Sequence, residues 1–171
     1  MGRPKPLLPV RETTLAGWIL ERLAPHFDEV LVAGSDPGAV PVGLRLVRDR
    51  PGHRLGPLAG IEAGLAAAAN DALVAVACDM PRVDASLAER LLALSAGRDA
   101  AVPRVGGRPE PACACYRRSA LAVLGRALDE GRLKAGAVLA ELDVAWLDDA
   151  DPRLFWNLNT PEDYQVFLSE L

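Results

Sequence analysis

Residues 72–78 form an almost wholly apolar run, ALVAVAC, which ends directly in Asp79 and is followed by Met80 and Pro81. A short run that is apolar on both faces is typical of a strand in a sheet covered on both sides, and such sheets are mostly parallel. Ligands of these sheets bind just beyond the carboxyl ends of the strands. The run therefore predicts a buried strand that presents the Asp79 carboxylate at a ligand-binding edge.

Two roles for Asp79 fit this pattern. A carboxylate at the end of a strand can hold a hard divalent cation such as Mg²⁺, which takes oxygen ligands and bridges to substrate phosphates. Asp79 can instead serve only as the cap of the helix that follows. The run by itself favours neither role.

The composition limits the class of protein. A chain of 171 residues with 50% hydrophobic and 25% charged residues is expected to form one globular domain, residues 1–171. A net charge of −4 argues against a basic face for a polynucleotide, so we expect no nucleic-acid partner and any bound nucleotide to be small. No apolar run approaches the ~20 residues of a membrane span, and the N-terminus lacks the apolar core of a signal peptide. We therefore expect a cytoplasmic protein without a membrane partner.

The cysteines and histidines do not predict a zinc site or a hydrolase triad. Cys78, Cys113 and Cys115 form no CxxC pair, and no histidine lies close to them in sequence. Cys113 and Cys115 have strand spacing and should face one side as small buried side chains. His26 and His53 have no recognisable carboxylate or serine partner.

Helix and strand patterns alternate along the chain, which predicts a three-layer α/β/α domain with a mostly parallel, Rossmann-like sheet. The expected helices span 14–23, 60–69, 84–95, 119–130 and 135–142, with a last helix starting after Thr160-Pro161. The expected strands span 29–33, 44–47, 72–78, 100–102, 111–116 and 144–147.

A glycine-rich segment at Gly56 to Gly60 enters one of these helices. Main-chain amides at a helix start are unpaired donors near a positive helix end, so a polar, electron-rich ligand can dock there. Taken alone, the segment is better explained as a tight loop. Asp49 at the end of another strand and Lys5 near the N-terminus change this balance. With Asp79 they predict a site for a nucleoside triphosphate and its metal ion.

Asn157 and Asn159 precede the last helix and have strand spacing, so their amides are expected to point to the same side. They can recognise a polar substrate through hydrogen bonds. The alternative, which this segment alone favours, is that they bond to local backbone in the turn before Thr160.

These motifs together resemble the MobA-type molybdenum cofactor guanylyltransferases, which are glycosyltransferase-A-like nucleotidyltransferases. Four segments carry the resemblance in the family's order and span nearly the whole chain. They are MGRPKPLL at 1–8, GPLAGI at 56–61, CDMP at 78–81 and NLNTPED at 157–163.

The resemblance implies that the protein transfers GMP from GTP to the molybdenum–molybdopterin cofactor, forming the guanine dinucleotide cofactor and pyrophosphate with Mg²⁺. It implies GTP and molybdopterin as substrates, and molybdenum-insertion or molybdoenzyme maturation proteins as partners. In-line attack on the α-phosphorus needs positioning and charge neutralisation but no protein nucleophile. The implied roles are Asp79 as metal ligand, Lys5 as triphosphate contact, Asp49, Gly56, Pro57 and Leu58 on the guanosine side, and Asn157 and Asn159 toward the pterin.

Two departures from the family pattern matter. The family has an asparagine near the end of its second strand, where this chain reads Ala33-Gly34-Ser35, so that contact is lost or passes to Ser35. Family members also begin with a strand and a LAGGxSxRMG loop, whereas this chain opens at what resembles the final Met-Gly of that loop. The resemblance therefore predicts a missing first strand, marginal stability and weakened GTP binding.

Two other functions remain open on the sequence. A cytidylyltransferase or a sugar-nucleotide relative would use the same scaffold. A noncatalytic nucleotide-binding scaffold would have kept the fold and lost the loop, although the retained Lys5, Asp49 and Asp79 weigh against it.

Overall fold

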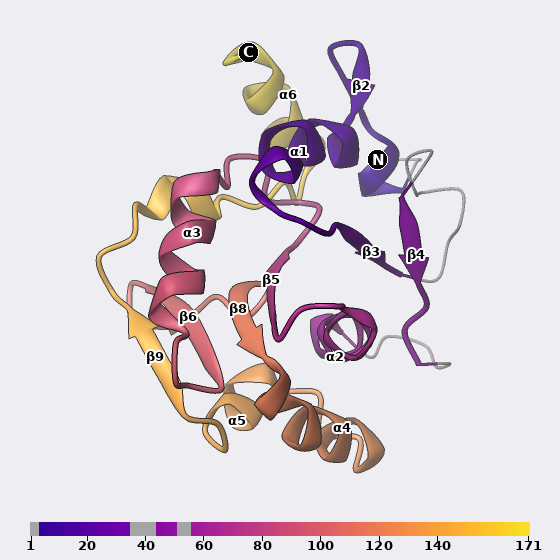
Figure 1. Cartoon of the computed structure of the whole chain (residues 1–171). Coiled ribbons are helices and arrows are strands. Elements are labelled where there is room, and N and C mark those ends of the chain that lie inside the picture. Colours follow the sequence, from indigo (N-terminus) through magenta and orange to yellow (C-terminus); the bar gives the residue numbers. More distant parts are fainter. Residues whose placement is uncertain (1–3, 35–43, 51–55) are drawn as a thin grey trace.

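The computed structural model describes residues 4–34, 44–50 and 56–171, in which strands form a central layer with helices on both faces (Figure 1). The strands are β1 Pro9–Val10, β2 Thr13–Thr14, β3 Leu31–Ala33, β4 Arg45–Val47, β5 Ala72–Val76, β6 Ala100–Val105, β7 Arg108–Pro109, β8 Cys113–Arg117 and β9 Val144–Leu147. The helices are α1 Leu15–Leu23, α2 Pro57–Ala67, α3 Ala85–Leu94, α4 Leu121–Asp129, α5 Ala135–Leu139 and α6 Pro161–Ser169, with short 3₁₀ turns at Lys5–Leu7, Ala24–His26, Arg118–Ala120 and Pro152–Phe155.

The larger sheet is mixed. β8 lies between β5 and β6 and runs antiparallel to both, β7 pairs with the end of β6, and β9 runs parallel to β6. β3 and β4 form a separate parallel pair, and β1 and β2 a small hairpin. The predicted α/β class is confirmed. The direction of β8 differs from the mostly parallel expectation because a glycine turn and the short β7 connect it to β6, and such a short connection returns the chain antiparallel.

Side chains alternate between two apolar layers. Cys113 and Cys115 face the layer that includes α1 and α3, as expected, and both are fully buried. Ala114 and Tyr116 face the opposite layer with α2, α4 and α5. The Tyr116 hydroxyl donates to the carbonyl of Pro111 at 2.8 Å, which satisfies the polar end of a buried ring.

Helix starts follow the sequence signals closely. Asp84 caps α3 by accepting from the Leu87 amide at 2.9 Å, and Thr160 and Asp163 form a capping box at α6. Helix α2 begins at Pro57, three residues before the predicted start, because a proline fits the first helical position.

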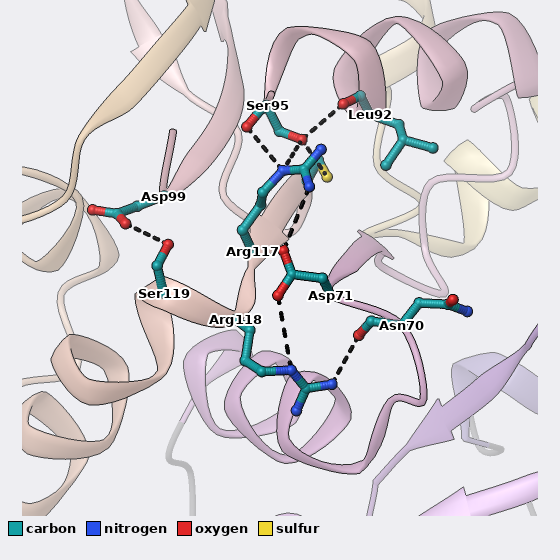
Figure 2. Close-up of polar contacts among 9 residues, drawn as sticks. Asn70, Asp71, Leu92, Ser95, Asp99, Arg117, Arg118 and Ser119 are labelled. Atoms are coloured by element: carbon teal, nitrogen blue, oxygen red, sulfur yellow. Dashed lines mark hydrogen bonds and ion pairs between the residues drawn. The ribbon is translucent and has the colours of Figure 1, made fainter. Parts of the chain in front are cut away.

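A polar network fixes the amino end of β5, opposite the end that carries Asp79 (Figure 2). Arg117 Nε donates to the carbonyl of Ser95 at 2.9 Å, and its guanidinium lies 3.5 Å from Asp71. Arg118 Nη2 donates to the carbonyl of Asn70 at 2.9 Å. These contacts tie the start of β5 to β8 and to the end of α3.

The apolar strand β5 is only partly buried along all of its residues, whereas the sequence predicts a fully buried strand. Within the described ranges it pairs with β8 on one side and with no strand on the other. None of the helices in these ranges is long and apolar enough to cross a membrane.

Candidate functional site

Asp79 follows the carboxyl end of β5, as the apolar run predicts. The Met80 amide donates to the carbonyl of Ala77 at 3.1 Å, and the carbonyl of Asp79 accepts from the Leu158 amide at 2.9 Å. These two bonds hold the backbone while the carboxylate remains 22% exposed. Helix α3 is capped by Asp84, so the capping role considered for Asp79 is not observed.

Lys5 brings the N-terminal segment to this carboxylate. Its Nζ atom donates to Asp79 Oδ2 at 2.9 Å and to Asn159 Oδ1 at 3.1 Å. The first turn of the described chain, the end of β5 and the segment before α6 therefore meet at one ammonium group. Three residues predicted separately from the sequence are thus in direct contact.

The two asparagines differ in their contacts. Asn159 accepts from Lys5, whereas Asn157 Nδ2 donates to the carbonyl of Phe155 at 3.1 Å. Asn157 thus makes the local backbone bond that the sequence offered as an alternative. Both side chains nevertheless line one shallow hollow beside α6.

A cavity of about 630 Å³ lies beside Asp79, between β3, β5, α1 and α2. Asp49, which follows β4, lines its rim together with Gly56 and Pro57 at the start of α2. Gly56 has φ of 68°, a conformation that favours glycine. Leu58 is fully buried in the core and is not among the residues that line the cavity, so its predicted contact with guanosine stays a prediction. The other predicted guanosine-side residues share this rim.

The donor set of this rim fits a metal ion that arrives with phosphates. Asp79 supplies one carboxylate and Asp49 lines the same cavity. Among residues 4–34, 44–50 and 56–171, no three or more His, Cys, Asp or Glu side chains group into a metal site. Mg²⁺ commonly binds through one or two carboxylates, several waters and substrate phosphates. The residues present suit that mode rather than an all-protein cage.

Cys78 lies next to Asp79 but is a poor nucleophile. Burial raises the pKa of its thiol, and the neighbouring Asp79 carboxylate raises it further. The group therefore stays protonated at neutral pH, where only a thiolate would attack. The rim around Asp79 thus offers a ligand charge and hydrogen bonds, and the Cys78 thiol does not supply a nucleophile there.

Sequence reasoning missed Arg82. Its guanidinium lies 4.1 Å from the centroid of the Trp156 ring and is held by Glu170. Arg82 and Trp156 line the hollow that contains both asparagines. The position of Arg82 directly after CDMP was an available signal, but its stacking on Trp156 depends on the fold. Ser35, proposed as a substitute nucleotide contact, lies outside the described residues.

Comparison with known families decides the assignment. The model of the MobA-like NTP transferase domain matches residues 1–146. The chain belongs to this family. The matched range includes Lys5, Asp49, Gly56 and Asp79, while Asn159 lies beyond it.

Relatives of this MobA-like NTP transferase have consistent names. It is 38% identical over 173 residues to the molybdenum cofactor guanylyltransferase of Rhodobacter capsulatus, covering 95% of this chain and 85% of that protein. The enzyme of the same name from Cereibacter sphaeroides is 36% identical over 167 residues with the same coverage.

Solved structures agree with this family. Molybdopterin-guanine dinucleotide biosynthesis protein A from Archaeoglobus fulgidus superposes with a TM-score of 0.82 and 28% identity, covering 99% of this chain and 93% of that one. The 2-C-methyl-D-erythritol 4-phosphate cytidylyltransferase of Thermus thermophilus has a TM-score of 0.75 at 23% identity, covering 98% and 93%. This second likeness concerns the fold alone.

Proposed function

We propose that this MobA-like NTP transferase is a molybdenum cofactor guanylyltransferase, which transfers GMP from GTP to the molybdenum–molybdopterin cofactor. The observation that carries the proposal is the contact of Lys5 with both Asp79 and Asn159, beside the cavity at the carboxyl end of β5. The guanylyltransferase relatives at 36% and 38% identity support the choice of reaction.

In this reaction a phosphate oxygen of the acceptor attacks the α-phosphorus of GTP. One P–O bond forms, the bond from the α-phosphorus to the oxygen shared with the β-phosphate breaks, and pyrophosphate leaves with that electron pair. The residues are required to position both substrates and to balance charge. Asp79 is proposed to hold Mg²⁺, which when bound offsets the charge of the triphosphate.

Lys5 is proposed to exchange partners when nucleotide binds. In the structure its ammonium neutralises Asp79 at 2.9 Å, and both side chains are partly exposed. A triphosphate with Mg²⁺ would give each charge a new partner, the phosphate for Lys5 and the cation for Asp79. Because neither charge is then left uncompensated, the exchange avoids the penalty of an isolated buried charge.

The two substrates are proposed to occupy opposite sides of this ion pair. Asp49, Gly56 and Pro57 border the cavity side and would contact guanosine. Asn157, Asn159 and the Arg82–Trp156 stack border the hollow beside α6 and would contact the pterin and its phosphate.

Pyrophosphate release from GTP, CTP and ATP, each with Mg²⁺ and molybdenum-loaded molybdopterin, tests the proposal. We expect GTP to be used with the highest kcat/KM, and turnover to require the added Mg²⁺. Preferential use of CTP would assign a cytidylyltransferase instead. Binding of GTP without turnover, under conditions where the guanylyltransferase of Rhodobacter capsulatus turns over GTP, would indicate a noncatalytic scaffold.

A further inference from the structure

Asp49 reaches the rim of the cavity from the end of a short strand. In the described part of the chain, β4 pairs with β3 alone, over Arg45–Val47, and Asp49 follows two positions later. Two short strands paired only with each other are marginally stable in water. Contacts outside this pair must therefore fix the position of Asp49.

Arg50, the next residue, makes such a contact with helix α2. Its Nη2 atom donates to Oε1 of Glu62 at 2.9 Å, and its Nε atom lies 3.5 Å from Oε2 of the same carboxylate. A two-point contact of this kind fixes direction as well as distance. Glu62 is only 16% exposed, so the pair is screened less than one on the open surface. Arg50 thus joins the end of β4 to the helix that begins at Pro57.

The same guanidinium also reaches a second helix. Arg50 Nη1 bonds to Oδ1 of Asp129 at the end of α4. A side-chain carbon at Gly125 in α4 would lie 3.4 Å from Arg50 Nη2, so glycine at this position leaves room for the guanidinium. Helix α2 packs against both the β3–β4 pair and α4 (Figure 1). One side chain therefore connects the end of β4 to two helices.

The other end of β4 is bonded to the same helix. Arg45 Nη1 donates to the carbonyl of Ala67, the last residue of α2, at 3.2 Å. Arg45 also lies 3.5 Å from Glu29, whose carboxylate accepts from the Ala69 amide at 2.8 Å. The start of β4 is thus held at the end of α2, and the residue after β4 is held closer to the start of α2. The end of the strand that leads to Asp49 therefore lies toward the glycine-rich start of the helix.

A purely structural role is the alternative for Arg50, and the chain contains an arginine for comparison. Arg132 bonds to Glu130 at 2.7 Å and to Glu141, and its side chain is 34% exposed against 35% for Arg50. Arg132 follows α4 and is not among the residues that line the cavity or the hollow beside α6. Arg50 differs in place, because it adjoins Asp49 and is bonded to the helix whose start lines the same rim.

We propose that Arg50 is a positioning residue for nucleoside binding, which holds Asp49 at a fixed place relative to the start of α2 by bonding to Glu62 and Asp129. The inference rests on the proposed function, in which Asp49 and the start of α2 contact guanosine. Consecutive Cα atoms are about 3.8 Å apart, so fixing residue 50 leaves its neighbour little freedom. A contact group that is already held in place loses less entropy when its ligand binds. Arg50 does not itself line the cavity, so it acts on GTP through Asp49.

Calorimetric titration of GTP, in the presence of Mg²⁺, tests the inference. Arg50→Met should weaken GTP binding about tenfold, because Asp49 must then be ordered by the ligand. Glu62→Gln leaves Arg50 in place and removes the charge of its partner, so it should weaken GTP binding in the same direction. Arg132→Met is the matched control and should bind GTP like wild type. Unchanged GTP binding in both Arg50→Met and Glu62→Gln, or equal weakening in Arg132→Met, would overturn the inference.

A double-mutant cycle separates positioning from a merely structural role. If Arg50 acts through Asp49, Arg50→Met should weaken GTP binding in the wild-type background and cause no further loss in Asp49→Ala. Thermal melts of the same four proteins record the structural part, which should be equal in the two backgrounds. A further tenfold loss of GTP affinity in the Asp49→Ala background would overturn the inference while leaving the proposed function intact. Failure of the wild-type chain to bind GTP would instead contradict the proposed function, and the inference with it.

Discussion

The ammonium of Lys5 lies 2.9 Å from Oδ2 of Asp79, although 74 positions separate the two residues in sequence. The contact places the N-terminal segment against the carboxyl end of β5. Asn159 accepts a second bond from the same ammonium at 3.1 Å. The candidate site is thus assembled from three distant segments around one cation.

Replacing Lys5 should impair nucleotide use more than stability. The ion pair is partly exposed, so Lys5→Met should cost no more than about 1 kcal/mol of unfolding free energy. Loss of the charge should lower kcat/KM for GTP on the order of 100-fold. Steady-state assays and urea unfolding measure the two effects.

The chain contains one other lysine, Lys134, which is exposed and precedes α5. Lys134→Met therefore removes an equal charge from a segment that contributes no residue to the site. It should leave kcat/KM for GTP unchanged. Equal loss in the two variants would mean that net charge, and not the position of Lys5, controls GTP use.

The different contacts of the two asparagines predict different kinetic effects. Asn159→Ala removes a bond that orients Lys5, so it should raise the KM for GTP about tenfold. Asn157 bonds to the carbonyl of Phe155, so Asn157→Ala should leave the KM for GTP unchanged and alter only the KM for the molybdopterin acceptor. A rise in the KM for GTP in both variants would refute this division.

Local signals in the sequence explain why most elements were predictable. Asp84 and Thr160 cap their helices through bonds spanning three residues, so the side chain and its target amide are close in sequence. The apolar run 72–78 likewise ends at residues that mark a strand end, the charged Asp79 and the nearby Pro81. Features of this kind depend on the neighbouring residues and not on the rest of the fold.

Other features could not be read from neighbouring residues. The bond between Lys5 and Asn159 joins positions 154 residues apart, and Arg82 meets Trp156 only because the segment before α6 returns to the end of β5, where the Leu158 amide bonds to Asp79. The sequence suggested both asparagines as a matched pair, yet only Asn159 reaches the ammonium. Such contacts follow from tertiary packing, which periodicity and spacing do not specify.

Asp163 should make the stability of the chain depend on pH in the acid range. Backbone amides of Thr160, at 2.8 Å, and of Asn159, at 3.0 Å, donate to its carboxylate and lower its pKa in the folded state. Its contribution is therefore fully present above the usual pKa of about 4 and is lost as the pH falls through the lower folded value.

Asp163→Asn should accordingly reduce the unfolding free energy at pH 7, and the difference from wild type should shrink as the pH drops below about 4. Urea unfolding at several pH values measures it. Glu162→Gln, one position earlier in the same helix turn, is the control and should show a smaller effect. A difference for Asp163→Asn that is constant with pH would contradict the assignment.

Gly56 should tolerate a side chain poorly for conformational reasons alone. Among the residues that the structure describes, none has an atom within 4 Å of a Cβ placed there, but Gly56 has φ of 68° and ψ of −169°. This backbone region is essentially restricted to glycine, so Gly56→Ala should destabilise the chain by about 1–3 kcal/mol through backbone strain. Gly136 in α5 likewise has no neighbour within 4 Å in the described part of the chain, and its φ is not positive, so Gly136→Ala should be neutral or stabilising in thermal melts of both variants. Equal melting shifts in the two variants would remove strain as the cause.

The Asp79 carboxylate is proposed to hold the metal ion for transfer from GTP. Asp79→Asn keeps the shape of the side chain and an oxygen that can accept from Lys5, but it removes the charge. Asp71→Asn, at the amino end of the same strand, is the matched control. Turnover of GTP should be measured for both across a Mg²⁺ titration, together with thermal melts. Asp79→Asn should melt like wild type and lose turnover on the order of 1,000-fold, whereas Asp71→Asn should retain turnover. Wild-type turnover and Mg²⁺ dependence in a folded Asp79→Asn variant would show that Asp79 does not hold the metal ion.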